Sequence, residues 1–363
     1  MKKIRVGIVG ASIGRGWAAN AHIPALRALP QFEITALATT RQASADEAAR
    51  HYGIPLAFGD AGKLAAHPDI DLVAVTVKVP GHYDAVMAAL DAGKHVFCEW
   101  PLALDSAQAS RMFEMARAKG LLHVVGLQAR CQPAVVYLKD LLAEGYLGEV
   151  LSCSMLVSNR QWGTQTDRAG AYLFDRANGA TLLTIPGGHS LDALAYCLGE
   201  FREVSAVLAT RRPEATLTDT GEKISKTAPD QIAISAVLES GAVAAIQVRG
   251  NDTQGTQFLF EIQGTGGHLT LTGSASVQYG TLALRGAQGQ DEPKALPVPA
   301  RYTLVGGDVP PGAAFSVAQV YAGFAASLES GIAAAPGFDV ALARHRMIEA
   351  IQKASDTGRR VTL

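Results

Sequence analysis

Stretches of continuous hydrophobic residues alternate with helical patterns through the first third of the chain. Unbroken apolar strands between helices are typical of a parallel sheet covered on both faces. Several glycines, such as Gly53, Gly93 and Gly120, follow the predicted helices directly and would end them. The pattern predicts strands at residues 4–9, 32–38, 72–79, 95–98 and 121–125 and helices at 17–29, 44–52, 83–92 and 106–119, with Ser44 as an N-cap.

The pattern changes after a predicted helix at residues 134–144, because strand-like stretches separated by glycine-containing turns then dominate. This succession indicates an antiparallel sheet with a helix at 191–198 beside it, followed by two closing helices at 315–329 and 339–354. Residues 286–312 are rich in Gly, Pro and Ala and predict a long surface excursion. The predicted strands lie at residues 150–157, 204–208, 231–238, 243–248, 258–263 and 268–271.

Length, charge and cysteine content narrow the class of protein. A chain of 363 residues is too long for one ordinary core, and 48% hydrophobic with 18% charged residues is typical of a globular protein. A net charge of -1 without basic blocks argues against nucleic acid or an anionic membrane as partner. The four cysteines form no C-x-x-C pair, so we expect no metal site, no disulfide framework and a cytoplasmic location.

A glycine-rich turn follows the first strand. Gly10, Gly14 and Gly16 lie where a dinucleotide-binding fold places its phosphate turn, although Ser12 and Arg15 stand at the usual second and third glycines. We therefore expect Gly10, Ser12, Ile13 and Arg15 to bind a cofactor. The alternative is a plain βα turn.

The end of the second strand carries two hydroxyls and a guanidinium, in Thr39, Thr40 and Arg41, where NAD-preferring proteins place a carboxylate. Arginine binds phosphate oxygens in pairs, which favours the 2′-phosphate of NADP over NAD. A solvated strand end with an incidental arginine is the alternative.

Several motifs make the chain resemble the glucose–fructose oxidoreductase and inositol dehydrogenase (Gfo/Idh/MocA) family, and within it the branch of the fungal galactose repressors. The family motifs lie at 92–96, 99–103, 188–192 and 261–267, and the motifs shared with the repressor branch lie at 12–17, 77–83, 99–100, 127–130 and 222–230. The resemblance implies an α/β N-terminal Rossmann domain at 1–130 and an α+β C-terminal domain at 131–363. That second domain would hold a large open, mostly antiparallel sheet, with C-terminal helices packing back on the first.

The resemblance also implies which catalytic residues are missing. Family enzymes use the lysine of a Glu-Lys-Pro motif together with an aspartate and a histidine, and Trp100 stands in place of that lysine. Ile185, or Thr184 with one inserted residue, stands in place of the aspartate, so His189 alone remains. A tryptophan cannot take the proton that leaves an alcohol during hydride transfer.

Three further residues are candidates for contacts with the cofactor or the substrate. Lys78, at the end of the strand predicted for 72–79, would contact the cofactor or act as a displaced base, or else it extends to solvent. His82 would lie near the nicotinamide ribose, or is only a residue at a helix start. His189 would be a base contacting substrate, or a hydrogen-bonded core histidine.

The remaining candidates lie close to the predicted ends of the Rossmann strands. Glu99 and Gln128 are expected to contact the cofactor, with an ion pair as the alternative for Glu99. Trp100 would stack on nicotinamide or sugar, or only fill the volume that the lysine left. Arg130 and Asp192 would contact substrate, unless Arg130 forms an ordinary interdomain salt bridge.

Two functions follow. The first is an NADP-dependent oxidoreductase that acts on a carbohydrate-like substrate with a non-standard acid/base set. The second is a non-catalytic NADP-binding regulator with a protein partner, and a scaffolding subunit without activity is a weaker third. An exposed sheet face predicts a homodimer or homotetramer through the C-terminal sheet.

Overall fold

A computed structural model describes residues 3–251 and 255–363 of the chain. The chain folds into two compact units. The first contains the N-terminal residues up to 128 together with 303–343, and the second contains 129–302 and 344–363. Each unit is described by itself.

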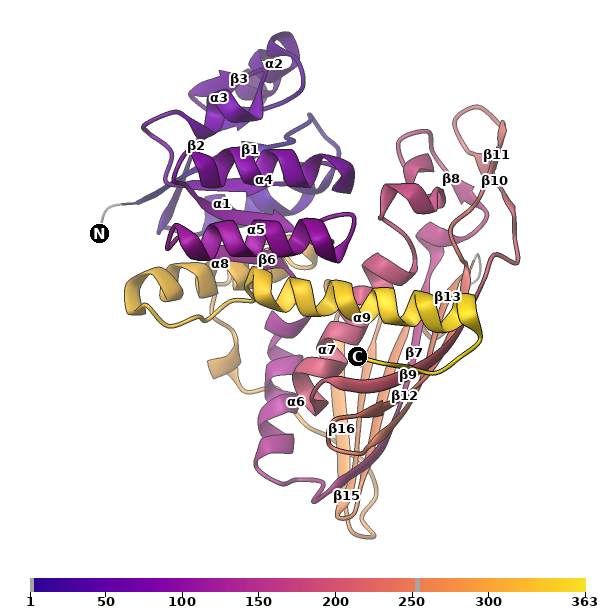
Figure 1. The fold of residues 1–363 in the computed structure, drawn as a ribbon. Helices are drawn as coiled ribbons and strands as arrows, with labels where there is room; N and C mark the ends of the chain where they lie inside the picture. Colours follow the sequence, from indigo (N-terminus) through magenta and orange to yellow (C-terminus); the bar gives the residue numbers. More distant parts are fainter. Residues whose placement is uncertain (1–2, 252–254) are drawn as a thin grey trace. The chain divides into compact units, whose positions relative to one another are not determined.

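The first unit is built on a six-stranded parallel sheet with strand order β3-β2-β1-β4-β5-β6 (Figure 1). This order is that of a Rossmann fold, whose ligand crevice lies beyond the carboxyl ends of the strands where the order reverses, between β1 and β4. The strands are β1 (Ile4–Val9), β2 (Phe32–Ala38), β3 (Leu56–Phe58), β4 (Leu72–Val75), β5 (His95–Glu99) and β6 (His123–Gly126).

Helices cover both faces of this sheet. Right-handed crossovers place α3, α4 and α5 on one face of the sheet, where α3 packs against α4 and α4 packs against α5 (Figure 1). Helix α1 lies on the other face and packs against α8. Helix α8 comes from the C-terminal part of the chain, so the last third of the sequence completes the first unit. The helices are α1 (Ile23–Ala28), α2 (Gln42–Tyr52), α3 (Ala61–Ala65), α4 (His82–Asp91), α5 (Ser106–Ala118) and α8 (Ala313–Ser330).

Two local predictions for this unit are wrong, and one predicted helix is confirmed with an irregular first turn. The strand predicted to reach residue 79 ends at Val75, so Lys78 does not lie on it. The helix predicted at residues 17–29 begins with a π-helical turn, η1 (Ala18–His22), before α1. Helix α2 starts earlier than predicted with Arg41 as N-cap, and the Ser44 hydroxyl donates a hydrogen bond to the Arg41 carbonyl oxygen from inside the helix.

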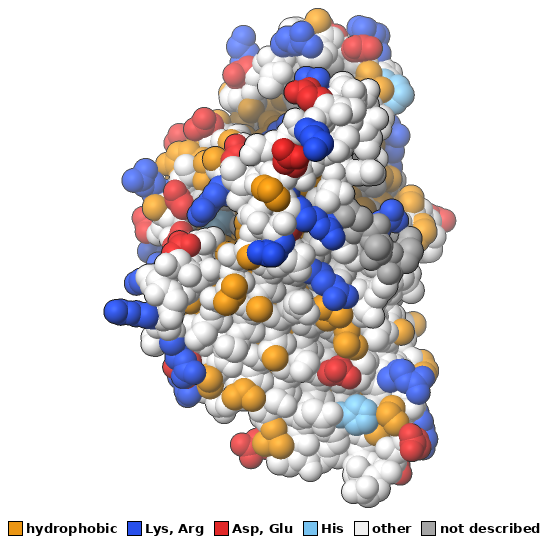
Figure 2. All heavy atoms as spheres, turned by 90° about the vertical axis from the view of Figure 1, so that its right-hand side faces the viewer, with side chains coloured by type: hydrophobic (Ala, Val, Ile, Leu, Met, Phe, Trp, Pro, Cys, Tyr) orange, Lys and Arg blue, Asp and Glu red, His pale blue; other side chains and the backbone are white. Residues whose placement is uncertain are grey.

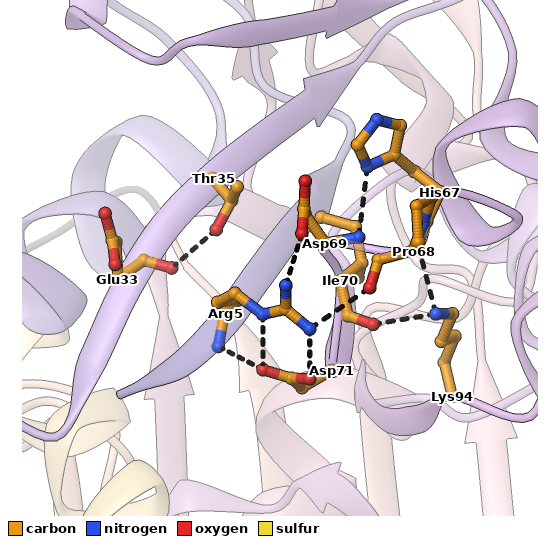
Figure 3. Close-up of polar contacts among 9 residues, drawn as sticks. All are labelled: Arg5, Glu33, Thr35, His67, Pro68, Asp69, Ile70, Asp71 and Lys94. Atoms are coloured by element: carbon orange, nitrogen blue, oxygen red, sulfur yellow. Dashed lines mark hydrogen bonds and ion pairs between the residues drawn. The ribbon is translucent and has the colours of Figure 1, made fainter. Parts of the chain in front are cut away.

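The amino-terminal edge of the same sheet is closed by a polar cluster around Arg5 (Figure 3). The Arg5 guanidinium makes two hydrogen bonds to the Asp71 carboxylate, at 2.8 and 3.0 Å, and also pairs with Asp69. Lys94 donates to the carbonyl oxygens of His67 and Ile70 beside it. These contacts tie the start of β1 to the start of β4, at the opposite edge from the expected cofactor crevice.

The second unit holds a nine-stranded mixed sheet with order β17-β16-β15-β14-β7-β13-β12-β9-β18. All its pairings are antiparallel except that of β7 with β13. This confirms the predicted large, mostly antiparallel sheet. The strands are β7 (Val150–Asn159), β9 (Phe201–Ala209), β12 (Gln231–Leu238), β13 (Val243–Gly250), β14 (Phe258–Gly264), β15 (Gly267–Gly273), β16 (Leu282–Gln288), β17 (Lys294–Ala295) and β18 (Val361–Thr362).

One face of this sheet is buried and the other is exposed, as the alternation of the strands requires. Buried residues alternate with exposed ones along β12 and β13. Helices α6 (Pro133–Ala143) and α7 (Gly188–Leu198) lie beside the sheet, and the long helix α9 (Phe338–Thr357) continues into this unit from Arg344 (Figure 1). A small second sheet joins β8 (Gln165–Thr166), β10 (Glu214–Leu217) and β11 (Lys223–Ser225).

Candidate functional site

The glycine turn after β1 has the backbone that a dinucleotide requires. Gly10 has a φ of 108°, and a Cβ there would lie 2.9 Å from the Val77 backbone nitrogen, so only glycine fits. Gly14 and Gly16 also have positive φ, and open space surrounds the position of a Cβ at each. Ser12, Ile13 and Arg15 are exposed on the same turn. The turn therefore presents open backbone of the kind that accepts a pyrophosphate.

Tyr52 stabilises this turn through two hydrogen bonds, and the sequence did not predict this contact. Its hydroxyl donates to the Ser12 carbonyl oxygen at 2.8 Å and accepts from the Gly14 backbone N–H at 3.2 Å. Tyr52 is the last residue of α2, nearly forty residues farther along the chain. Only a tertiary fold that brings the end of α2 against the turn after β1 reveals the contact.

The end of β2 offers one free cation. The Thr39 hydroxyl donates to the Arg41 carbonyl oxygen at 2.9 Å and lies 2.7 Å from the Ser44 hydroxyl, so it is already engaged within the loop. Thr40 and Arg41 are exposed. The Arg41 guanidinium makes no hydrogen bond or ion pair with any residue that the structure describes, which leaves it available to a phosphate.

The segment after β4 carries Lys78 and His82. Lys78 is exposed and caps the short 3-10 helix η2 (Val79–Gly81), which leads into α4. His82 is the first residue of α4 and is buried, with its ring nitrogens facing the carbonyl oxygens of Pro101 and Val77. Burial lowers the pKa of His82, against the effect of those carbonyls.

Glu99, the last residue of β5, sits at the centre of a buried hydrogen-bond network. Its carboxylate accepts from His22 Nε2 at 2.8 Å and from the Gln128 amide at 2.9 and 3.0 Å. The other nitrogen of His22 lies 2.8 Å from the Tyr321 hydroxyl on α8. Burial and the nearby Glu99 charge raise the pKa of Tyr321 well above its usual value. A neutral His22 satisfies both contacts by donating to Glu99 and accepting from Tyr321.

The network depends on the space beside Glu99, and it uses only part of the hydrogen-bonding capacity of Gln128. Gly126 on β6 leaves room for the carboxylate, because a Cβ there would lie 2.6 to 2.7 Å from the carboxylate atoms of Glu99. The Gln128 side-chain oxygen is buried and has no hydrogen-bond partner within the described part of the chain. Within the first unit, therefore, Glu99 and Gln128 bind each other, and one acceptor on Gln128 stays open.

Trp100 follows Glu99 directly. It is buried, and the peptide bond between Trp100 and Pro101 is cis. The tryptophan thus occupies the place of the family lysine with an apolar group that cannot titrate.

In the second unit, Arg130 and Asp192 form a paired-hydrogen-bond ion pair. Arg130 Nε donates to Asp192 Oδ2 at 2.8 Å, and its terminal nitrogen bonds the other carboxylate oxygen. A second buried guanidinium, that of Arg344, lies 3.8 Å from Asp192 and also pairs with Glu200. The Arg130 charge also lies over the Tyr196 ring. The Arg130–Asp192 pair lies within the second unit, so Arg130 makes a salt bridge there, and its contact with substrate stays a prediction.

His189, at the start of α7, has a different environment. It is buried, and its Nδ1 atom has no hydrogen-bond partner among the residues that the structure describes. Burial lowers the pKa of His189 to about 3, so the imidazole is neutral at physiological pH. Its Nδ1 atom therefore lacks the hydrogen bond that a core histidine would make there, and the role of His189 as a base stays a prediction. The nearby Thr184 hydroxyl donates to the Gly179 carbonyl oxygen at 2.7 Å, within the loop before α7.

The stretch 222–230, shared with the repressor branch, contains a buried ion pair. Lys226 Nζ lies 3.3 Å from Asp230 Oδ2 and donates to the carbonyl oxygens of Trp162 and Gly163. Asp230 also accepts from the backbone N–H groups of Arg211 and Arg212, each at 3.0 Å. These bonds fix the strands of the small sheet to the large one, so Lys226 and Asp230 have a structural role.

Two kinds of feature are absent from the described residues, 3–251 and 255–363. These residues contain no cluster of three or more His, Cys, Asp or Glu side chains placed to hold a metal ion. Nor do they contain a helix both long and apolar enough to cross a membrane.

Comparison with known proteins places the chain in a family. Residues 4–127 match the oxidoreductase family with an NAD-binding Rossmann fold (GFO_IDH_MocA), and residues 133–273 match the C-terminal domain of Gal80p. The galactose/lactose metabolism regulatory protein GAL80 of Kluyveromyces lactis is 30% identical over 305 residues, covering 78% of this chain and 67% of the relative. The chain therefore belongs to the Gfo/Idh/MocA oxidoreductase family and carries a Gal80p-type second domain, which confirms the predicted resemblance.

The relatives include enzymes as well as regulators. The dehydrogenase aclE of Aspergillus oryzae is 38% identical over 226 residues, which are 60% of this chain and only 61% of that relative. Among solved structures, Gal80p from Kluyveromyces lactis superposes with a TM-score of 0.86 at 26% identity, covering 99% of this chain and 94% of that one. Levoglucosan dehydrogenase in complex with NADH and levoglucosan has a TM-score of 0.85 at 24% identity and covers 99% of both chains, a likeness of fold alone.

Proposed function

We propose that the protein is an NADP-dependent oxidoreductase that acts on a sugar or polyol, with His189 as its acid/base residue. The observation that carries the proposal is the state of His189. It is neutral, and its Nδ1 atom is free to accept a proton. Dehydrogenases that act on sugars occur among the relatives, which supports a substrate of this class.

The first unit supplies the cofactor half of this proposal. The open backbone of Gly10 to Gly16 would hold the pyrophosphate, and Arg41, with no ion pair of its own, would bind the 2′-phosphate. When bound, NADP would supply the hydride acceptor. The Gln128 side-chain oxygen, which has no partner among the described residues, could accept a hydrogen bond from a cofactor group such as an amide N–H.

The chemical step is proton removal coupled to hydride transfer. The substrate carbinol carbon would lose its hydride to the nicotinamide and its hydroxyl proton to His189, which leaves a ketone and an imidazolium. A residue whose pKa is near 3 is a weak base, so the proposal predicts slow turnover. His189 is already deprotonated well below neutral pH, so its titration should not change turnover between about pH 5 and about pH 8. Lys78 is exposed and remains a second candidate base if it reaches the substrate.

A screen of substrates tests this function. Purified protein with NADP⁺ is mixed with a panel of aldoses, polyols and sugar acids while the absorbance of reduced nicotinamide is followed. Reduction that is lost in His189→Ala but kept in Thr184→Ala would support His189 as the base. No turnover with any member, in a protein that binds NADPH tightly, would contradict it.

The replacement of the family lysine by Trp100 favours a second candidate, a non-catalytic NADP-binding regulator. The match of the second unit to the Gal80p C-terminal domain supports the same candidate. A regulator would bind NADPH without turnover, and it would need a protein partner. Restoring the lysine with Trp100→Lys tests the difference, since activity that appears only in this variant would identify the natural protein as the regulator.

A further inference from the structure

His82 has a carbonyl oxygen against each of its two ring nitrogens. Nδ1 lies 2.8 Å from the Pro101 oxygen, and Nε2 lies 2.9 Å from the Val77 oxygen. The side chain is 1% exposed, so water does not replace either partner. Val77 belongs to the segment after β4 and Pro101 to the turn after β5, so one side chain bridges two neighbouring segments at the carboxyl edge of the sheet.

This arrangement suits only one protonation state in full. Carbonyl oxygens accept hydrogen bonds and cannot donate them, and a neutral imidazole has a single N–H. In the neutral form, one of the two contacts would therefore set a nitrogen lone pair against an oxygen lone pair. The imidazolium form carries two N–H groups and makes both hydrogen bonds.

The surroundings of His82 oppose that form in one way and favour it in another. Burial is the largest effect and lowers the pKa of His82 below its usual value. The backbone groups of Val77, Pro101 and Leu102 and the negative charge of Glu99 act in the opposite direction. The other charged groups near this end of α4 are Lys78, which caps η2, and Asp84 in the first turn of the helix. Uptake of a proton and closure of both bonds are therefore coupled.

We propose that His82 is a positioning residue whose imidazolium form ties the segment after β4 to the turn after β5, and so sets the position of Trp100. Loss of the proton would release one of the two segments. The effect on cofactor binding rests on the proposed function, because both segments lie at the edge where the nicotinamide end of NADP would bind.

The first test uses the protein without any cofactor. Nuclear magnetic resonance of ¹⁵N-histidine-labelled protein, recorded from about pH 5 to about pH 8, reports whether His82 gains its second proton. The signal is assigned by its absence in His82→Gln. The proposal expects His82 to titrate and the Trp100 indole signal to move with the same midpoint. A His82 that stays neutral throughout, or a Trp100 signal that does not follow it, would overturn the proposal.

The second test measures NADH affinity by fluorescence over the same range in the wild type and in His82→Gln, whose amide offers one donor side and does not titrate. NADH is used because the 2′-phosphate of NADPH itself titrates near pH 6. We expect the wild type to bind about fivefold more tightly after protonation of His82, the effect of one added hydrogen bond, with no such change in the variant.

The two tests distinguish the proposed link between the two segments, made by His82, from the proposed cofactor site. Equal pH dependence in the wild type and the variant would overturn the effect of His82 on the cofactor. If NADH binds at no pH, the proposed function fails. The coupled titration of His82 and Trp100 then decides by itself whether His82 links the two segments. That titration is read in the wild-type protein, and if His82→Gln is unstable, His82→Asn supplies the missing signal by which His82 is assigned.

Discussion

At the scale of single residues, Gly126 decides whether the Glu99 network can form. A methyl group at Gly126 would meet the Glu99 carboxylate at less than 3 Å, so Gly126→Ala must displace it from His22 and Gln128. A buried carboxylate without its donors costs about 1–3 kcal/mol or more. We expect the free energy of unfolding in urea to fall by that amount. Gly306→Ala, where a Cβ meets nothing within 4 Å, should leave it unchanged; an equal loss in both variants would contradict the argument.

Arg41 decides the choice of cofactor in the proposed function. A guanidinium that binds the 2′-phosphate contributes about 1.5–3 kcal/mol, or about tenfold or more in affinity. We expect Arg41→Ala to weaken NADPH binding by that factor and NADH binding little, as measured by calorimetry. Arg111→Ala, an exposed arginine on α5, is the matched control. Equal losses for the two cofactors would mean that Arg41 does not bind the phosphate.

The sequence predicted those site residues that lie next to a recognisable strand or motif. Gly10, Arg41, Glu99 and His189 are examples of such residues. It did not predict the partners of these residues, such as Tyr52 and His22, because the contacts join segments far apart in the chain. Gln128 was predicted to bind cofactor, and the structure adds that its amide nitrogen is already bound to Glu99.

At the scale of elements, the buried Lys226–Asp230 pair holds the small sheet in place. Lys226→Met would leave the Asp230 charge buried and two carbonyl oxygens without a donor. Breaking a buried ion pair in this way costs about 3–5 kcal/mol. We therefore expect faster amide hydrogen exchange in β10 and β11, measured by mass spectrometry.

The neighbouring exposed pair provides the control for that experiment. Lys223 bonds Glu214 at 3.1 Å at the surface, and Lys223→Met removes an interaction of about 0–1 kcal/mol. Exchange in the small sheet should hardly change in this variant. If Lys226→Met protected β10 and β11 as well as the wild type does, the ion pair would not be what holds them.

The elements that sequence predicted well are those with a strong period. Strand β12 has the predicted bounds, because buried positions alternate with more exposed ones along it and a glycine-containing turn follows at residues 239–241. The short strands β3, β10 and β11 were missed because three or four residues carry no measurable period. The end of β4 was wrong because the apolar run continues through Val77 and Val79 after the strand has stopped.

At the scale of the whole molecule, the exposed face of the large sheet is flat and made mainly of small side chains. Rows of paired residues cross it, such as Ser205, Ser235, Ala245, Ser154 and Thr270, with Glu261 as the one acid of that row. Figure 2 looks onto this side and shows scattered hydrophobic side chains with charged ones mostly around them. Val207 and Val243 are 65% and 52% exposed there. Small side chains and exposed hydrophobic residues on one face favour association with the same face of a second copy of the chain.

We predict that two copies associate through this face, alone or as part of a tetramer. Ala245 on β13 lies in the middle of the sheet, so Ala245→Arg would bury a charge without a partner at the centre of a symmetric interface, a cost of several kcal/mol. Sedimentation equilibrium at micromolar concentration should show the wild type as a dimer or tetramer and the variant as a smaller species with an unchanged circular dichroism spectrum. Ala66→Arg, at an exposed helix end in the first unit, should leave the association as it is. A wild type that sediments as a monomer would refute the interface, and an Ala245→Arg protein that stays associated would place it on another surface.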